Sequence, residues 1–156
     1  MKKRFLFVSP HPDDVELGAG GTICKLVQAG HKVCVLDLTS GEPTPYGSEQ
    51  KRQRETKKSS RILGIGTRIN LALPNRFLFD SKEARLRLAE QIRIFKPDVL
   101  LCPYFEDAHP DHIACSKITE AARFYAKYSK ISLRGGPHYP YYLWISTIST
   151  YLSLLL

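Results

Sequence analysis

The sequence lacks any long hydrophobic run, and this absence limits where the protein is expected to act. No stretch of about 18 purely apolar residues occurs, so an ordinary transmembrane helix is not predicted. The N-terminus is basic, but the apolar run after it is short and no small-residue cleavage site follows, which argues against an export signal. We therefore expect a cytoplasmic protein with no membrane span.

Cysteine is also scarce, and its spacing argues against two kinds of stabilising site. The four cysteines are Cys24, Cys34, Cys102 and Cys115, and they contain no C-x-x-C pair. Three of them lie among apolar neighbours. This pattern favours buried thiols in a reducing compartment over a disulfide framework or a cysteine-type zinc site.

Acidic residues are few relative to basic ones. Lys and Arg total 23 against 15 Asp and Glu, which gives a formal net charge of +8. Such a charge suits nucleic acid, an acidic membrane face or a small anionic substrate. The basic run over residues 51–61 has no interleaved aromatics and matches no nucleic-acid module. We interpret it as a solvated helix face and expect no nucleic-acid partner.

The order of the expected elements predicts the fold. A chain of 156 residues is expected to form one domain with a real core. Short β-rich runs alternate with helical periodicity, and Ser48 and Ser81 are suitable helix caps. This alternation predicts a Rossmann-like three-layer α/β domain with a mostly parallel sheet and sites at the carboxyl ends of the strands. The expected strands cover 5–9, 32–39, 68–73 and 98–102, and the expected helices cover 17–29, 48–63, 81–96 and 112–128.

The first motif that carries chemistry is Pro10-His11-Pro12-Asp13-Asp14, directly after the first expected strand. His11 and Asp14 are three residues apart, so both can point at one spot from a tight turn. Imidazole nitrogen and carboxylate oxygen together suit zinc or a similar divalent metal. Asp13 adds a carboxylate that can act as a base. Taken alone, the motif fits a polar turn capping the next helix equally well.

The second motif follows the fourth expected strand. It contains two histidines and two carboxylates within six residues, namely Asp107, His109, Asp111 and His112. Because two such clusters are expected at strand ends of one sheet, we favour a functional site over the alternative that both are simply polar turns. Together they offer His11, Asp14 and one histidine of the second motif as three protein ligands. With a fourth position left for water, this is the layout of a catalytic zinc site.

Both motifs resemble those of the LmbE-like zinc de-N-acetylases, the family that includes PIG-L. Residues 10–22 match the family segment PHPDDxExGxGGT, and residues 109–112 match its later HPDH segment. The resemblance covers roughly residues 4 to 140 and is nearest to the bacillithiol-biosynthesis deacetylases, which act on N-acetylglucosaminyl-malate. It implies zinc-dependent hydrolysis of the N-acetyl group of an N-acetylglucosamine-type conjugate, releasing acetate and a free amine.

The resemblance also implies roles for individual residues. By motif position, His11, Asp14 and His112 would bind zinc or another divalent metal, and Asp13 would be the general base. Zinc would make water a nucleophile near neutral pH, which amide hydrolysis requires.

Two further residues of the second motif receive catalytic roles from the resemblance. His109 would stabilise the oxyanion or protonate the leaving amine, and Asp111 would orient the ring of His109.

Substrate contacts are expected from two residues between the motifs. Arg54 occupies a family position near the substrate, and a guanidinium suits a carboxylate-bearing ligand. Glu42 is a candidate acceptor for sugar hydroxyls, although a loop residue beside prolines can also be simply exposed. We therefore expect a small anionic sugar conjugate as partner, and related enzymes suggest a homo-oligomer.

The glycines Gly18, Gly20 and Gly21 raise a rival hypothesis, a nucleotide-binding module. Their spacing is G-x-G-G, not G-x-G-x-x-G, and Asp37 is the one acidic candidate in the second strand. We instead expect these small residues to let the helix approach the sheet and the metal loop closely. A nucleotide-binding module and a non-catalytic fragment are kept as alternative functions.

The C-terminal segment departs from the family pattern. From Tyr139 to Leu156 the chain carries no charged side chain, whereas family members continue for tens of residues with a further strand and helices. We expect a deacetylase domain over 1–140 and an atypical apolar tail over 141–156. A truncated or frame-shifted ending would explain the tail and would lower solubility.

Overall fold

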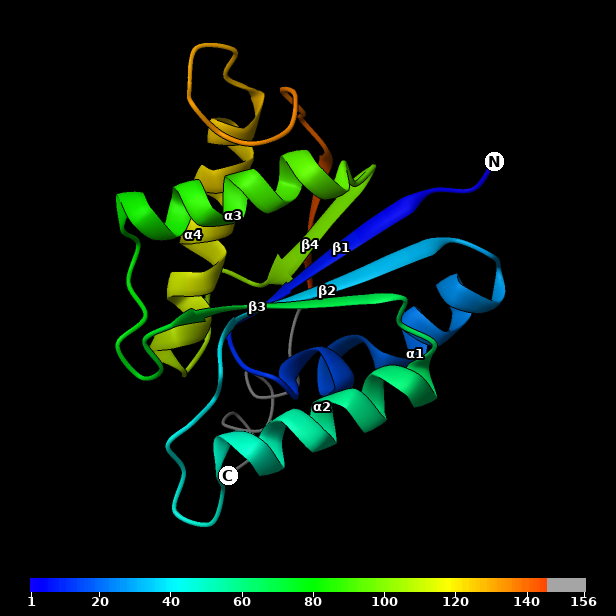
Figure 1. Cartoon of the computed structure of the whole chain (residues 1–156), viewed down its shortest axis with the longest axis vertical. Helices are drawn as coiled ribbons and strands as arrows, with labels where there is room; N and C mark the ends of the chain where they lie inside the picture. Colours follow the sequence, from blue (N-terminus) through cyan, green and yellow to red (C-terminus); the bar gives the residue numbers. More distant parts are fainter. Residues whose placement is uncertain (146–156) are drawn as a thin grey trace.

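The computed structural model describes residues 1–145 and shows a three-layer α/β fold (Figure 1). Five parallel strands form one sheet in the order β3-β2-β1-β4-β5. The strands are β1 (Arg4–Ser9), β2 (Lys32–Thr39), β3 (Thr67–Leu73), β4 (Val99–Pro103) and β5 (Tyr141–Ile145). The helices are α1 (Asp14–Gln28), α2 (Glu49–Leu63), α3 (Lys82–Phe95) and α4 (Pro110–Lys127).

The strand order reverses between β1 and β4. From β1 the chain moves outward through β2 to β3, and it then returns to place β4 on the other side of β1. In parallel α/β sheets, such a switch point opens a crevice outside the carboxyl ends of the two central strands. The predicted fold class is confirmed, and this crevice lies where both motifs leave the sheet.

The two faces of the sheet are covered by different helices. Figure 1 shows α1 and α2 on one side and α3 and α4 on the other. A hydrophobic cluster lies on each face of the sheet. Alternate residues of β1 pack into the two clusters, because successive side chains of a strand point to opposite faces. Leu6 belongs to the cluster that includes Leu88 of α3 and Ile118 of α4. Phe7 belongs to the cluster that includes Ile23 of α1. A sheet buried on both faces therefore has strands that are almost continuously apolar.

The helix caps follow the sequence prediction. Ser48 Oγ accepts a hydrogen bond from the Lys51 amide at 3.2 Å, and Ser81 Oγ accepts one from the Ala84 amide at 3.1 Å. Gly64 ends α2 in the left-handed region, with φ at 70°. In contrast, α1 and α4 begin earlier than expected, at Asp14 and Pro110. Both motifs therefore supply the first turn of a helix.

The basic helix α2 contains no buried residue, in agreement with the predicted solvated face.

The expectation that the glycines of α1 let this helix approach the sheet and the metal loop closely is not supported at two positions. Among the described residues, a Cβ at Gly20 would meet its nearest neighbour, Leu63, at 3.9 Å, and a Cβ at Gly21 would meet nothing within 4 Å. Neither glycine is in close contact with the sheet or with the metal loop.

The cysteines are free thiols, as expected. Cys34, Cys102 and Cys115 are buried, and Cys24 is partly exposed. Burial raises the pKa of the Cys34 and Cys102 thiols to about 12, so both stay protonated at neutral pH.

The expected tail begins inside the sheet. Residues Tyr141–Ile145 form β5, which pairs with β4 in parallel. The Tyr142 hydroxyl lies 3.0 Å from Cys102 Sγ. Residues 146–156, and with them the expectation of a truncated or frame-shifted ending, lie outside the described residues. Within residues 1–145, no helix combines the length and apolarity needed to cross a membrane.

Candidate metal centre and active-site pocket

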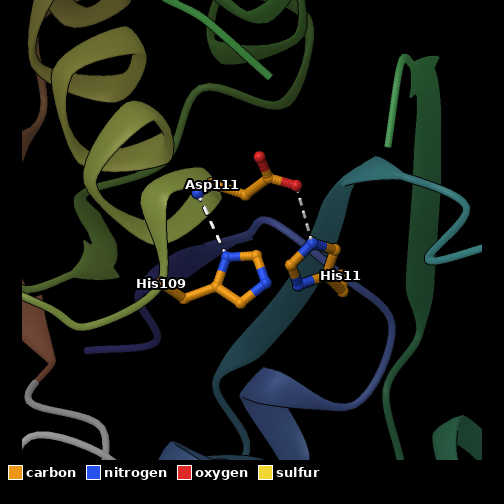
Figure 2. Close-up of side chains that lie close together, drawn as sticks. All are labelled: His11, His109 and Asp111. Carbon is orange, nitrogen blue, oxygen red and sulfur yellow. Dashed lines mark hydrogen bonds and ion pairs between the residues drawn. The ribbon is translucent and has the colours of Figure 1, made fainter. Parts of the chain in front are cut away.

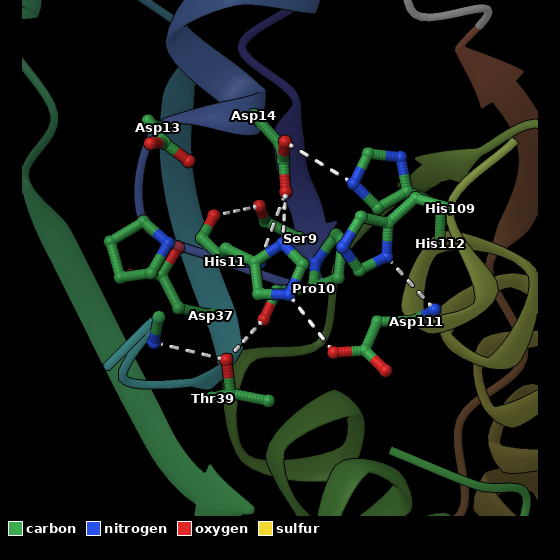
Figure 3. A network of polar contacts seen from close by, with 12 residues as sticks. Ser9, Pro10, His11, Asp13, Asp14, Asp37, Thr39, His109, Asp111 and His112 are labelled. Carbon is green, nitrogen blue, oxygen red and sulfur yellow. Dashed lines mark hydrogen bonds and ion pairs between the residues drawn. The ribbon is translucent and has the colours of Figure 1, made fainter. Parts of the chain in front are cut away.

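The two motifs meet at the switch point of the sheet. His11 and Asp14 lie between the end of β1 and the first turn of α1, while His109 and His112 lie between β4 and the first turn of α4. Figure 3 shows these side chains converging from the two connections. Residues about one hundred positions apart in the chain become neighbours because β1 and β4 pair directly.

His11, Asp14 and His112 form a set of donors that fits a divalent metal. Their ligand atoms all lie within 4.8 Å of one another. Asp14 Oδ2 lies 3.1 Å from His11 Nδ1, and Asp14 Oδ1 lies 3.4 Å from His112 Nε2. Two imidazoles and one carboxylate are the ligand types of catalytic zinc sites, which use three protein ligands. The three residues predicted as ligands are therefore brought together.

The local electrostatics favour a cation among these three groups. Burial opposes ionisation of Asp14, but both histidines outweigh it and hold its pKa well below the usual range. Burial likewise opposes protonation of His11, yet hydrogen bonds to Asp14 and Asp111 raise its pKa. Against the same burial effect, Asp14 and Asp107 raise the pKa of His112 to about 9. A negative potential that favours protons on both rings also favours a metal ion.

Asp107 supports His112 from behind, a role that the sequence did not assign to it. Its Oδ2 lies 3.0 Å from His112 Nδ1, and its side chain is 2% exposed. Its Oδ1 accepts a hydrogen bond from the His109 amide at 2.9 Å. A carboxylate on one ring nitrogen of a metal-binding histidine fixes the ring and leaves the other nitrogen for the metal. The signal in the sequence was the first carboxylate of the second motif, five residues before His112.

Asp111 acts on a different neighbour from the one expected. Its buried Oδ2 lies 3.0 Å from His11 Nε2 and accepts a hydrogen bond from the Arg76 amide at 2.9 Å. Its contact with His109 runs through the backbone, because the Asp111 amide donates to His109 Nδ1 at 3.1 Å (Figure 2). The carboxylate thus contacts His11 directly, and an orienting effect of this carboxylate on His109 stays a prediction.

Asp13 is the most exposed acidic group of the first motif, with 51% of its side chain accessible. Arg52 of α2 holds it, with Nη1 2.8 Å from Asp13 Oδ2. Arg52 Nε also lies 3.5 Å from Glu42 Oε1. Glu42 is buried, and its carboxylate accepts hydrogen bonds from the amide and hydroxyl of Thr44. Glu42 therefore lies behind Arg52 and holds it beside Asp13.

Arg54, the arginine chosen from the sequence, is exposed on α2, and the structure does not place it among these groups. Residues two apart on a helix point in different directions, so only one of Arg52 and Arg54 can face Asp13. The charge pattern of the segment could not decide between them.

A pocket of about 260 Å³ opens beside the metal centre. It is lined by residues from both motifs, from the two loops that follow β2 and β3, and from α2: His11, Asp13, Gly41, Thr44, Arg52, Asn75, Arg76 and His109. His109 stacks on His112 with ring centroids 4.9 Å apart. Burial and the neighbouring His11 and His112 lower the pKa of His109, which favours its neutral form.

A second polar network lies beneath the first motif and was not predicted. Arg68 of β3 binds Asp37 at 2.8 Å and Glu16 at 2.5 Å, and Ser59 of α2 donates to Glu16 at 2.5 Å. Burial raises the pKa of Asp37 to about 6 despite its contact with Arg68. Asp37, the acidic candidate for a dinucleotide site, is thus engaged in a buried ion pair.

Comparison with known proteins agrees with the motifs. The family model described as "PIG-L: GlcNAc-PI de-N-acetylase" matches residues 6–123. Diacetylchitobiose deacetylase from Thermococcus kodakarensis is 34% identical over 120 residues, which cover 70% of this chain and 45% of the relative. A 1D-myo-inositol 2-acetamido-2-deoxy-alpha-D-glucopyranoside deacetylase from Thermomonospora curvata is 29% identical, over 78% of this chain and 52% of the relative.

A solved structure shows the same fold. The conserved protein TT1542 from Thermus thermophilus superimposes with a TM-score of 0.88 at 40% identity, over 92% of this chain and 66% of that one. The chain spans about half the length of the two curated relatives.

Proposed function

Because this chain belongs to the PIG-L family of GlcNAc-PI de-N-acetylases, we propose that it hydrolyses the N-acetyl group of an N-acetylglucosamine-type conjugate. Water is consumed, and acetate and a free amine are released. The observation that carries the proposal is the convergence of His11, Asp14 and His112 beside a pocket that also contains Asp13 and His109.

His11, Asp14 and His112 would hold the metal, for which zinc is the proposed ion. Zinc bound there would supply a Lewis acid that polarises the amide carbonyl and makes water an effective nucleophile near neutral pH. Asp107 and Asp111 would fix the two histidine rings through contacts at 3.0 Å each.

Asp13 is the proposed general base. Its carboxylate lines the pocket and is accessible, whereas Asp14 is mostly buried and faces both histidines. Arg52 holds Asp13 in place at 2.8 Å through a hydrogen bond between charged groups. Asp13 would accept a proton from the attacking water, a role that contributes roughly 10²- to 10⁴-fold to rates.

His109 is the proposed donor to the developing oxyanion. Its Nδ1 accepts the Asp111 amide hydrogen, and since a backbone amide can only donate, the ring proton belongs on Nε2. The lowered pKa agrees with this neutral tautomer. The Nε2–H group can therefore donate to the acetyl oxygen without carrying a full positive charge. The proton taken up by Asp13 can then pass to the leaving amine.

The proposed substrate is a glucosamine carrying an N-acetyl group. Both curated relatives are named as deacetylases of such sugars, diacetylchitobiose and an acetamido-deoxy-glucopyranoside. Within this class we propose N-acetylglucosaminyl-malate, the bacillithiol precursor suggested by the sequence, because a carboxylate-bearing conjugate suits the net charge of +8. Substrate contacts from Glu42 and Arg54, and a homo-oligomer, also remain proposals.

The test is a panel of N-acetylglucosaminides assayed for release of a primary amine. Purified protein is assayed as isolated, after treatment with a chelator, and after zinc is restored. Activity that disappears with the chelator and returns with zinc supports the proposal. No amine release from any member of the panel by the zinc-loaded protein contradicts it.

A matched pair of histidine variants tests the metal centre separately. His112→Ala removes one of the three proposed ligands, and elemental analysis should show that most zinc is lost. His31→Ala is the control, because His31 accepts a hydrogen bond from the Lys3 amide near the amino end of the sheet. Stoichiometric zinc in His112→Ala would show that the ligand set is wrong.

A further inference from the structure

Arg76 occupies an unusual backbone position at the rim of the pocket. It lies between β3 and α3 and has a φ of 65°, in the left-handed region. A side chain is strained there, whereas glycine is not. The Asp111 carboxylate offsets this strain by accepting the Arg76 amide at 2.9 Å. A turn alone would be formed more easily with glycine, so the long side chain at this position calls for an explanation.

The charge of Arg76 has no acidic partner among the described residues. Its Nη2 donates to the Pro43 carbonyl at 2.7 Å, which joins the loops after β2 and β3 across the pocket. Arg52, the other arginine of the pocket, is neutralised by Asp13 at 2.8 Å and by Glu42 at 3.5 Å. Arg76 therefore supplies an uncompensated positive charge at the pocket's edge, while Arg52 does not.

We propose that Arg76 is the specificity-determining residue of this pocket and binds an anionic group, carboxylate or phosphate, on the substrate's aglycone. The proposal rests on the proposed deacetylase function, since it assumes that the acetyl group lies at the metal centre. A guanidinium on the rim can form two parallel hydrogen bonds with such an anion, using donors that do not contact Pro43. Specificity for an acidic conjugate then depends on Arg76, which lines the pocket, more than on Arg54 of α2, which does not.

The decisive variant is Arg76→Gly. Glycine adopts a positive φ without strain and retains the amide that donates to Asp111, so only the side chain is removed. Three N-acetylglucosaminides are compared: the malate conjugate, the 1-phosphate and the neutral methyl glycoside. We expect kcat/KM to fall about 10- to 100-fold for the preferred anionic conjugate, the effect of losing a charged hydrogen bond, and to change little for the methyl glycoside. The two anionic conjugates show whether carboxylate or phosphate is preferred.

Three further variants separate charge from position. Arg76→Lys keeps the charge but loses the paired hydrogen bonds, so it should restore part of the preference. Arg61→Ala removes an exposed arginine from the last turn of α2, outside the pocket, and should leave the preference unchanged. Arg54→Ala is the rival test. A selective loss in Arg54→Ala without one in Arg76→Gly would overturn the proposal.

A binding measurement keeps this proposal separate from the proposed function. Calorimetry with the zinc-loaded protein measures the affinity for the same three conjugates, whether or not they are hydrolysed. Tighter binding of an anionic conjugate that disappears in Arg76→Gly supports the role of Arg76 even if no amine is released. Wild-type protein that shows no preference for either anionic conjugate, in turnover or in binding, overturns it.

Discussion

Removing the carboxylate of Asp107 should weaken metal binding without unfolding the protein. Asp107 is 2% exposed and lies 3.0 Å from His112 Nδ1, so water neither screens the contact nor replaces it readily. Carboxylates that hydrogen-bond to metal-binding histidines typically contribute about 10- to 100-fold to metal affinity, or about 1.4–2.7 kcal/mol. Asp107→Ala removes both the charge and the acceptor, so its loss of metal affinity should be near the upper end of this range. Asp107→Asn keeps an acceptor, so its loss of metal affinity should be near the lower end.

The assay is a zinc competition titration against a fluorescent chelator at constant pH. Thermal unfolding of each metal-free variant is measured alongside, because Asp107 also accepts the His109 amide and its loss removes that contact from the loop. Asp98→Asn is the matched control, since Asp98 accepts the Arg4 amide at 2.7 Å before β4, at the opposite edge of the sheet. If both Asp107 variants bind zinc within about twofold of the wild type, well below the expected range, Asp107 does not support His112.

Asp13→Asn should keep its zinc, measured by elemental analysis, but lose roughly 10²- to 10⁴-fold in turnover, because the amide is not a base. Near wild-type turnover would remove Asp13 from the mechanism. His109→Ala should likewise keep zinc and lose about 10²- to 10³-fold in kcat if its Nε2–H stabilises the oxyanion. Between about pH 4 and 6, folded Asp37, with a pKa of about 6, binds a proton that the unfolded chain has released. The stability of the wild type relative to Asp37→Asn, measured by urea unfolding, should therefore fall by about 2–3 kcal/mol as the pH rises through this window. A rise would contradict the assignment.

Much of the fold could be predicted because its signals are local. Ser48, Ser81 and Gly64 mark helix ends through hydrogen bonds or backbone angles that involve only nearby residues. The strand order is different in kind. The residues of β1 alone do not indicate that this strand pairs with β2 and β4. The pairing of β1 with β4 brings His11 close to His112.

The sequence predicted only those residues of the candidate metal centre that belong to the two motifs. Spacing predicts His11 and Asp14 with one histidine of the second motif, and the family resemblance selects His112. The structure brings these three together. The contacts of Asp111 could not be predicted, because its partner Arg76 lies 35 residues earlier and is recognised through a backbone amide. Amide groups are present at every residue except proline, so a sequence gives no sign of which one a buried carboxylate will bind.

Because Asp111 contacts both the metal centre and the pocket rim through one oxygen, cation binding at His11 and anion binding at Arg76 are expected to affect each other equally. One atom, Oδ2, contacts both the ring of His11 and the amide of Arg76. If a cation held by His11 strengthens anion binding at Arg76 by some factor, the anion must strengthen cation binding by the same factor. The zinc affinity of the resting protein would then be lower than that of the protein during turnover. An acidic substrate would help to retain the ion that its own hydrolysis requires.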